Sequence, residues 1–309
     1  MKSIAMHGLV AASHSPFHPD GSLAPEVVPL QAAHVAEQGM EMVFITGSTG
    51  ESHSLTRDEK FCLFEAWATA APAHNLKVVA HVGSNCLHDA AWLAAAAADC
   101  QLAAISALAP SYYKPATLEI LIECCAMISS SAPKLPFYYY DIPVLTGVAF
   151  PMDDFLRAAD EKLPSLAGIK FTHDDAATYA RALEAAGDRY DIPWGVDERL
   201  LDALFTGARG AVGSSYNFAA SYYQQMWQAW DQGNADLARH WQKRAADLIE
   251  RLAAVGYLGA AKALMSWRGV PVGPPRLPLA TSSDDALAQL RSDLENSFPE
   301  VLEPSRAAV

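Results

Sequence analysis

The stretch LAGIKFTH, residues 166–173, has the composition of a buried strand that is interrupted by a lysine. Leu166, Ile169 and Phe171 are apolar, yet Lys170 stands between two of them. Lysine is almost never fully buried without a partner, and an unpaired buried ammonium sheds its proton rather than stay charged. Lys170 is therefore a surface residue on an edge strand, a member of a buried ion pair, or a desolvated amine kept for chemistry.

Seven further apolar runs occur along the chain, and helical patterns alternate with them. The eight expected strands are residues 8–13, 42–46, 77–83, 103–110, 136–143, 166–172, 193–198 and 210–215. Continuous apolar strands that alternate with amphipathic helices indicate a parallel sheet buried on both faces. The pattern predicts an α/β fold, a closed (β/α)8 TIM barrel, which has no edge strand on which a surface lysine could lie.

A doubly wound open sheet is the structural alternative. It would usually show a glycine-rich phosphate turn after the first strand, whereas residues 13–21 read SHSPFHPDG. Thr56 and Glu59 form a capping box, and Gly39 is typical of a helix stop. After residue 220 the pattern is helical, with a proline-rich joint at 269–280. We therefore expect a catalytic barrel over residues 1–220 and a C-terminal helical extension over 221–309.

Composition excludes several classes of protein. The 309 residues are 51% hydrophobic and 18% charged, which allows a sizeable core. The formal net charge of -13 argues against nucleic-acid binding, and no apolar run is long enough to suggest a membrane span or a cleaved signal peptide. The five cysteines show neither a CxxC pair nor a disulfide framework. We expect reduced thiols in a cytoplasmic protein.

Polar residues follow six of the expected strands, at the end of the barrel where active sites form. The six strand ends are GSTGES (47–52), PSYYKP (110–115), YYYDIP (138–143), KFTHDD (170–175), GVDE (195–198) and GSSYN (213–217). In the first of them, the glycines around Ser48 and Thr49 allow a tight turn of N–H and hydroxyl groups that suits a carboxylate or phosphate. The same residues also fit an ordinary capped turn.

Lys170, near the end of its strand, fits a Schiff-base nucleophile, because burial favours the neutral amine that attacks a ketone. Tyr138 and Tyr140 share one face of a strand, and Tyr140 is nearer the mouth of the barrel. A phenol there can relay a proton beside an amine or simply pack. Asp197 and Glu198 could bind a metal, but no histidine cluster accompanies them. We therefore favour a role for both carboxylates as hydrogen-bond acceptors for the hydroxyls of a substrate.

Six motifs together resemble the N-acetylneuraminate lyase branch of the dihydrodipicolinate synthase family, over about residues 8–279. In order along the chain they are GSTGES, FYYYDIPVLTGV (137–148), GIKFT (168–172), GVDE, GAVGSSYN (210–217) and GPPRLPL (273–279). The resemblance implies a class I aldolase on a TIM barrel with a helical tail, usually a homotetramer. It also implies that no metal or organic cofactor is required, because a lysine carries the covalent step.

The resemblance assigns roles to individual residues. Lys170 matches the Schiff-base lysine, Tyr140 the tyrosine beside it, and Ser48 with Thr49 the pair that holds the keto-acid carboxylate. Tyr112 falls where relatives often place a tyrosine that reaches the neighbouring subunit's site. The positions that match sugar-binding residues are Thr172, Gly195, Asp197, Glu198 and Ser214.

The sequence also departs from relatives. The synthase branch has an arginine at the position of Leu145, so a second substrate carboxylate has no guanidinium partner. Asp141 and residues 173–175 do not match the relatives closely. The expected reaction is reversible cleavage of N-acetylneuraminate to N-acetylmannosamine and pyruvate. The alternatives are a pyruvate-dependent aldolase or hydratase for another 2-keto-3-deoxy sugar acid, a metal-dependent aldolase, and a non-catalytic barrel.

Overall fold

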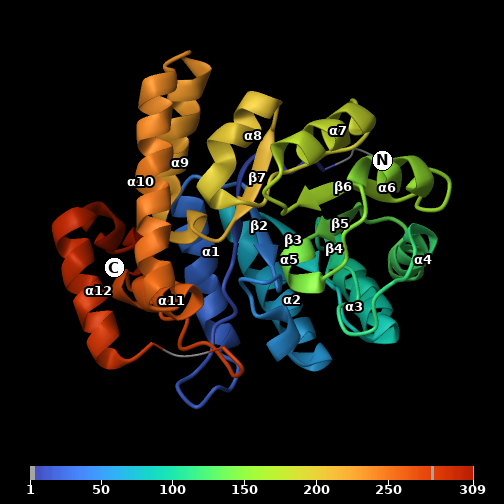
Figure 1. Ribbon diagram of the computed structural model, residues 1–309. Helices are drawn as coiled ribbons and strands as arrows, with labels where there is room; N and C mark the ends of the chain where they lie inside the picture. Colours follow the sequence, from blue (N-terminus) through green and yellow to red (C-terminus); the bar gives the residue numbers. More distant parts are fainter. Residues whose placement is uncertain (1–3, 280–281, 309) are drawn as a thin grey trace.

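Seven parallel strands form the centre of the computed structural model, which describes residues 4–279 and 282–308 (Figure 1). Their order around the sheet is β6-β5-β4-β3-β2-β1-β7. The strands are β1 (Gly8–Ala12), β2 (Met42–Ile45), β3 (Lys77–His81), β4 (Ala104–Leu108), β5 (Phe137–Asp141), β6 (Leu166–Phe171) and β7 (Gly210–Gly213). Each lies within one of the expected apolar runs.

The segment 191–195 closes the barrel between β6 and β7. Asp191 N donates to Ala167 O at 2.9 Å, and Trp194 N donates to Gly210 O at 2.9 Å. The expectation of a regular strand over 193–198 is wrong, because these bonds form isolated bridges and a short 3-10 helix starts at Asp197. The hydrogen bonds on both sides still complete the ring, and the predicted (β/α)8 barrel is confirmed.

Helices cover the outer face of the sheet, as the amphipathic patterns predict. They are α1 (Val28–Glu37), α2 (Arg57–Ala70), α3 (Leu87–Asp99), α4 (Leu118–Ser129), α6 (Met152–Ala159), α7 (Ala176–Ala186) and α8 (Leu200–Thr206), with a short α5 (Pro143–Thr146) after β5. Both hydrogen bonds of the capping box between Thr56 and Glu59 are present. Gly39 has φ of +78°, and the predicted helix stop there is confirmed.

The C-terminal part is helical, as expected, and its described residues form four α-helices. Its helices are α9 (Tyr216–Asp231), α10 (Ala235–Ala254), α11 (Tyr257–Trp267) and α12 (Asp284–Ser297). In Figure 1, α9 and α10 stand side by side, with α11 and α12 near their lower ends. Helix α9 spans residue 220 with a kink at Ala219, whose dihedral angles are not helical, and the division into 1–220 and 221–309 stays a prediction. No helix within the described ranges has the length and apolarity that a membrane crossing requires.

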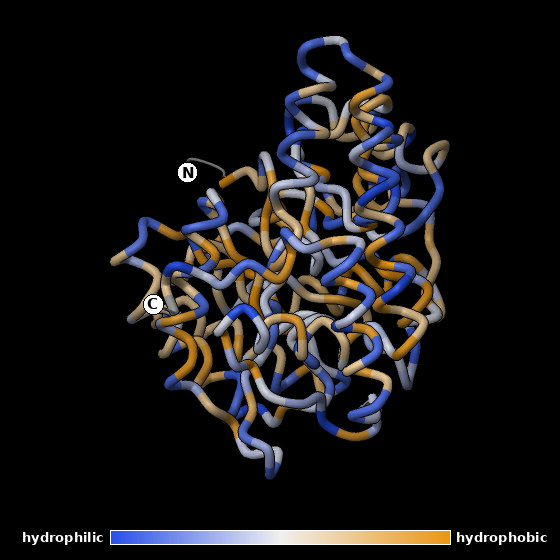
Figure 2. The backbone as a smooth tube through the Cα atoms, turned by 90° about the vertical axis from the view of Figure 1, so that its left-hand side faces the viewer, coloured by the Kyte–Doolittle hydropathy of each residue, from blue (hydrophilic) through white to orange (hydrophobic). Residues whose placement is uncertain are grey.

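Two apolar layers hold the barrel together. The larger lies between the sheet and its helices and continues into α10, α11 and α12. The smaller fills the barrel interior with side chains such as Val10, Phe44, Val79, Tyr138 and Tyr140. Apolar stretches accordingly gather in the body of the molecule, from which the hairpin of α9 and α10 projects (Figure 2). Any polar side chain among the interior residues is therefore surrounded by apolar and aromatic groups.

Candidate active site

Lys170 projects into the barrel interior from β6. Its side chain is buried, and Nζ lies 3.8 Å from the ring centroid of Tyr140 and 4.5 Å from that of Phe44. The ion pairs found among the described residues do not include Lys170. A closed barrel excludes the edge-strand interpretation, and the absent carboxylate partner removes the ion-pair interpretation. The remaining interpretation is a buried amine that faces two aromatic rings.

Tyr140 and Tyr138 share the inner face of β5 but serve opposite ends of the barrel. The hydroxyl of Tyr140 lies 3.2 Å from Ser48 Oγ, at the mouth. The hydroxyl of Tyr138 lies 3.0 Å from Asp191 Oδ2, at the other end. The predicted shared face, with Tyr140 nearer the mouth, is confirmed. Lys170, Tyr140 and the loop after β2 therefore meet at one place.

A pocket of about 560 Å³ opens at this end of the barrel, where the carboxyl ends of the strands meet. Eight of the ten residues predicted as catalytic or binding line it: Ser48, Thr49, Tyr140, Lys170, Gly195, Asp197, Glu198 and Ser214. Ser48, Thr49 and four of the five expected sugar-binding residues thus lie in the same cavity as Lys170. This grouping follows from parallel strands that all end on one side.

Asp197 is a buried acid that lines the pocket. Its Oδ2 accepts hydrogen bonds from Ser215 N at 2.9 Å and Ser215 Oγ at 2.6 Å. Burial, with the neighbouring charge of Glu198, raises the pKa of Asp197 to about 7, against the opposing effect of the Ser215 bonds. Asp197 can therefore act near neutral pH as either an acceptor or a donor toward a substrate hydroxyl.

Thr172 and Gly195 are packed against each other beside the pocket. A Cβ on Gly195 would lie 2.0 Å from Thr172 Oγ1, so glycine is the residue that this position accommodates. Thr172 does not line the cavity directly. Its Oγ1 is buried and, within the described residues, has no hydrogen-bond partner.

Tyr112, the remaining predicted residue, lies outside the pocket. Its side chain is 77% exposed and packs edge-on against Tyr113, with 5.0 Å between ring centroids. Its backbone N donates to Asn85 Oδ1 at 3.1 Å, which fixes the loop. The predicted role of Tyr112 in a neighbouring subunit stays a prediction.

The C-terminal helices supply pocket residues that the strand-end pattern does not identify. These are Ile249 and Ala253 on α10, Tyr257 and Leu258 on α11, and Leu279. The hydroxyl of Tyr257 lies 2.7 Å from Ser214 Oγ, and burial raises the pKa of this phenol. The apolar spacing of Leu258, Ala261, Leu264 and Met265 predicts a helix with one apolar face, but it does not indicate that this helix reaches the pocket.

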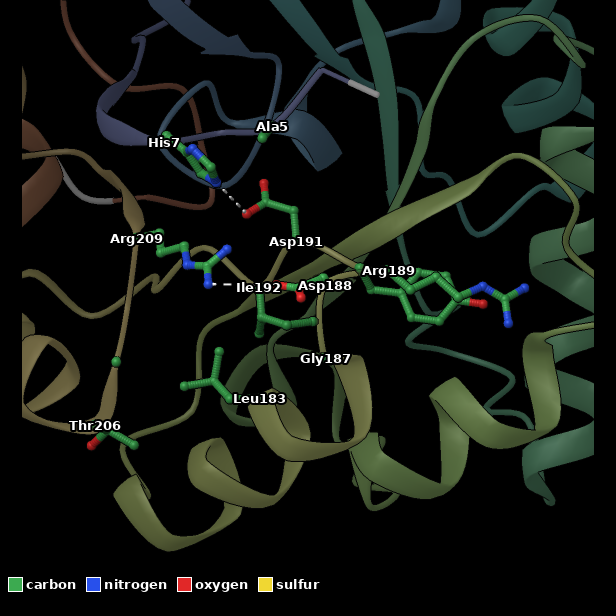
Figure 3. Close-up of a pocket in the computed structure, with 12 residues that line it drawn as sticks. Ala5, His7, Leu183, Gly187, Asp188, Arg189, Asp191, Ile192, Thr206 and Arg209 are labelled. Carbon is green, nitrogen blue, oxygen red and sulfur yellow. Dashed lines mark ion pairs between the residues drawn. The ribbon is translucent and has the colours of Figure 1, made fainter. Parts of the chain in front are cut away.

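A second cavity, of about 310 Å³, lies at the opposite end of the barrel (Figure 3). His7 Nε2 lies 3.7 Å from Asp191 Oδ1, and a guanidinium nitrogen of Arg209 lies 3.7 Å from Asp188 Oδ1. Asp191 also accepts a hydrogen bond from Met6 N at 2.6 Å, and burial raises its pKa. The contacts of Asp191 with Met6 and His7 hold the N-terminal segment against the barrel, at the end of the fold that serves stability.

The donor groups of the described residues offer no obvious metal site. No set of three or more His, Cys, Asp or Glu side chains is arranged there so that it could hold an ion. In the part of the chain that the structure describes, no third His, Cys, Asp or Glu side chain lies where it could complete a metal site with Asp197 and Glu198. The expectation that no metal or cofactor is needed stays a prediction.

Comparison with known proteins agrees with the fold. Residues 5–297 match the model of the dihydrodipicolinate synthetase family. The N-acetylneuraminate lyase of Gallus gallus is 35% identical, over 94% of this chain and 96% of the relative. That of Xenopus tropicalis is 38% identical, over 90% and 92%. The structure of Proteus mirabilis N-acetylneuraminate lyase superposes with a TM-score of 0.92 at 32% identity, covering 96% of this chain and 99% of that chain. The chain belongs to the dihydrodipicolinate synthetase family.

Proposed function

We propose that this chain catalyses the reversible retro-aldol cleavage of N-acetylneuraminate to N-acetylmannosamine and pyruvate, as a Schiff-base carbon–carbon lyase. The observation that carries the proposal is the position of Lys170 in one pocket with Tyr140, Ser48 and Thr49. Relatives that share more than a third of its residues over most of the chain are N-acetylneuraminate lyases. The geometry supplies the nucleophile, a phenol and a hydroxyl pair in reach of one ligand.

The covalent step begins with the neutral amine of Lys170. Its nitrogen attacks the C2 ketone of the open-chain sugar acid, and loss of water leaves an iminium. Ser48 and Thr49, which line the same pocket, are the proposed partners of the adjacent carboxylate. The cationic iminium then accepts the electron pair of the C3–C4 bond as that bond breaks.

Tyr140 serves the proton transfers. Its hydroxyl, next to Ser48, takes the proton of the C4 hydroxyl, directly or through the substrate carboxylate. The C4 oxygen becomes the aldehyde of N-acetylmannosamine, which leaves. The remaining enamine is reprotonated at C3, and water releases pyruvate and returns the free amine of Lys170.

The pocket also offers polar groups that suit a long polyhydroxylated chain. Asp197, Glu198, Ser214 and Tyr257 present carboxyl and hydroxyl groups there. Leu145, which is 61% exposed, also lines the pocket where the synthase branch has its arginine. A substrate with sugar hydroxyls therefore fits better than one with a second carboxylate.

Reduction of the Schiff base tests the proposal. Pyruvate with sodium borohydride is expected to add mass to Lys170, located by peptide mapping, and to block pyruvate release from N-acetylneuraminate. Lys60 and Lys262 are internal controls, because both are buried but do not line the pocket. The Lys170→Met variant is expected to show neither labelling nor activity.

Other outcomes identify the alternatives. Labelling of Lys170 with cleavage of a shorter 2-keto-3-deoxy acid, but not of N-acetylneuraminate, would select another aldolase or hydratase of the same fold. Activity that is lost with EDTA, without any labelling of Lys170, would contradict the Schiff-base chemistry. A folded protein with neither labelling nor activity would indicate a non-catalytic barrel.

We further propose a cytoplasmic homotetramer that acts in carbohydrate metabolism. The exposed Tyr112 and Tyr113, near the mouth of the barrel, support a protein interface at that surface. The family resemblance supports the tetramer, and five cysteines without a disulfide framework support a reducing compartment.

A further inference from the structure

Glu51 is a buried carboxylate in the loop that carries Ser48 and Thr49. Its side chain is fully buried, and its backbone has the left-handed φ of +55°. Oε1 accepts a hydrogen bond from Lys262 Nζ at 2.7 Å, and Oε2 accepts one from Arg276 N at 2.8 Å. Both oxygens thus bind groups that are more than 200 residues away in the sequence.

Lys262, on α11, uses its whole ammonium group in this contact. Besides Glu51, Nζ donates to Ser15 O at 3.0 Å and to Pro274 O at 3.0 Å. Three donors therefore meet three acceptors in a region without solvent. The lysine joins the loop after β1, the loop after β2 and the proline-rich segment 269–279.

The tied segments also carry pocket residues. Leu258 lies one helical turn before Lys262 on α11, and Leu279 lies three residues after Arg276. The ion pair of Glu51 and Lys262 therefore connects the loop of the keto-acid pair to the wall that the C-terminal part supplies.

Stability alone does not account for such a pair. Removing two charges from water is costly, and well-packed apolar residues in place of a buried ion pair are often as stable or more stable. A buried pair with every donor and acceptor used does, however, fix one arrangement of the groups around it. The arrangement fixed here is that of the loop holding Ser48 and Thr49.

We propose that Glu51 and Lys262 are positioning residues, which hold the hydroxyls of Ser48 and Thr49 at the place where the carboxylate of the 2-keto acid binds. This inference rests on the proposed function. Neither residue lines the pocket, so the pair acts through the loop and not by touching substrate.

The test is the pyruvate concentration that gives half-maximal borohydride labelling of Lys170. Glu51→Gln keeps the size of the side chain but leaves one acceptor oxygen for two donors. We expect the half-saturating concentration to rise about tenfold, the loss that accompanies one hydrogen bond to a charged group. In the synthesis direction, KM for pyruvate should rise alike. KM for N-acetylmannosamine should stay within about twofold of wild type, because Asp197, Glu198 and Ser214 are not among the hydrogen-bond partners of Glu51 and Lys262.

Two further variants complete the design. Arg244→Gln removes a different ion pair of the C-terminal part, in which Arg244 Nε donates to Glu300 at 3.0 Å. It should lower thermal stability and leave the half-saturating pyruvate concentration unchanged. If Glu51→Gln is recovered unfolded, Glu51→Asp replaces it, since the shorter carboxylate keeps the charge but cannot reach both partners.

The outcomes separate the two proposals. No labelling of wild-type Lys170 would overturn the proposed function and this role with it. Wild-type labelling, together with an unchanged half-saturating concentration in a folded Glu51 variant, would overturn the positioning role alone. An equal rise in KM for both substrates would also contradict it, because general loosening of the pocket would then be the cause.

Discussion

Asp141 is a buried acid next to Tyr140 that faces away from the pocket. Neighbours on a strand alternate, so Asp141 points from β5 toward the helices while Tyr140 points inward. Its side chain is nearly inaccessible, and Oδ1 has no hydrogen-bond partner among the described residues. Burial raises the pKa of Asp141 from 3.8 to about 7. The charged form is therefore unfavourable in the folded protein.

Replacing Asp141 with asparagine should stabilise the protein, more so at higher pH. With a folded-state pKa of about 7, the stability that this group contributes is complete below pH 3.8 and is lost as pH rises through 7. An amide does not titrate, so the gain in free energy of unfolding of Asp141→Asn should be about 2 kcal/mol larger at pH 8 than at pH 5. Urea unfolding at the two pH values measures the difference.

The exposed Asp231 provides the control for this measurement. Asp231→Asn should change the free energy of unfolding by less than about 0.5 kcal/mol at either pH, as surface substitutions usually do. A gain for Asp141→Asn that is the same at both pH values would show that Asp141 is not charged at pH 8 or that its pKa is not raised.

At the scale of the element, β6 depends on a glycine for its contact with the segment that closes the barrel. A Cβ on Gly168 would lie 1.7 Å from Asp191 O, and this oxygen accepts a hydrogen bond from Ile169 N at 3.0 Å. Relief of this clash requires the closing segment to move away from β6. Lys170, two residues along the same strand, would lose its fixed position.

Gly168→Ala should therefore lower the free energy of unfolding by about 3 kcal/mol, in the upper range for overpacking of a core. Gly233→Ala is the matched control: no atom lies within 4 Å of the added Cβ, and φ is +72°. It should cost only about 1 kcal/mol, from the left-handed backbone. Urea unfolding of both variants measures the difference. Equal decreases in the free energy of unfolding would mean that the closing segment moves away from β6 without destabilising the fold.

The elements differ in how far their sequence predicts them. Apolar runs identify the strands because every strand is buried on both faces, and glycine and capping residues mark helix ends locally. Residues 193–198 look like another strand, but the chain turns into a 3-10 helix at Asp197, and hydrogen bonds to two distant strands decide that geometry. Lys170 and Ser48 follow from strand ends, whereas Tyr257 follows only from tertiary packing.

At the scale of the whole molecule, the barrel and the C-terminal helices share one apolar core. Leu248 and Leu252 on α10, Leu264 on α11 and Leu294 on α12 belong to the same buried cluster as the outer face of the sheet. Helix α9 spans residue 220, with a kink at Ala219, whose φ of -126° and ψ of 23° are not helical. The change from strands to helices in the sequence predicts a boundary there, but it carries no information on which surfaces pack together.

We therefore expect the full chain to unfold in one cooperative transition. Calorimetry should give one peak, and circular dichroism in the far and near ultraviolet should report the same midpoint, because the barrel and the helices cannot separate without exposing the shared core. Arg244→Gln, which weakens a contact within the C-terminal part, is expected to move the whole transition to lower temperature. A separate early transition in this variant, with borohydride labelling of Lys170 retained above it, would instead establish residues 1–220 as a barrel that folds independently of residues 221–309.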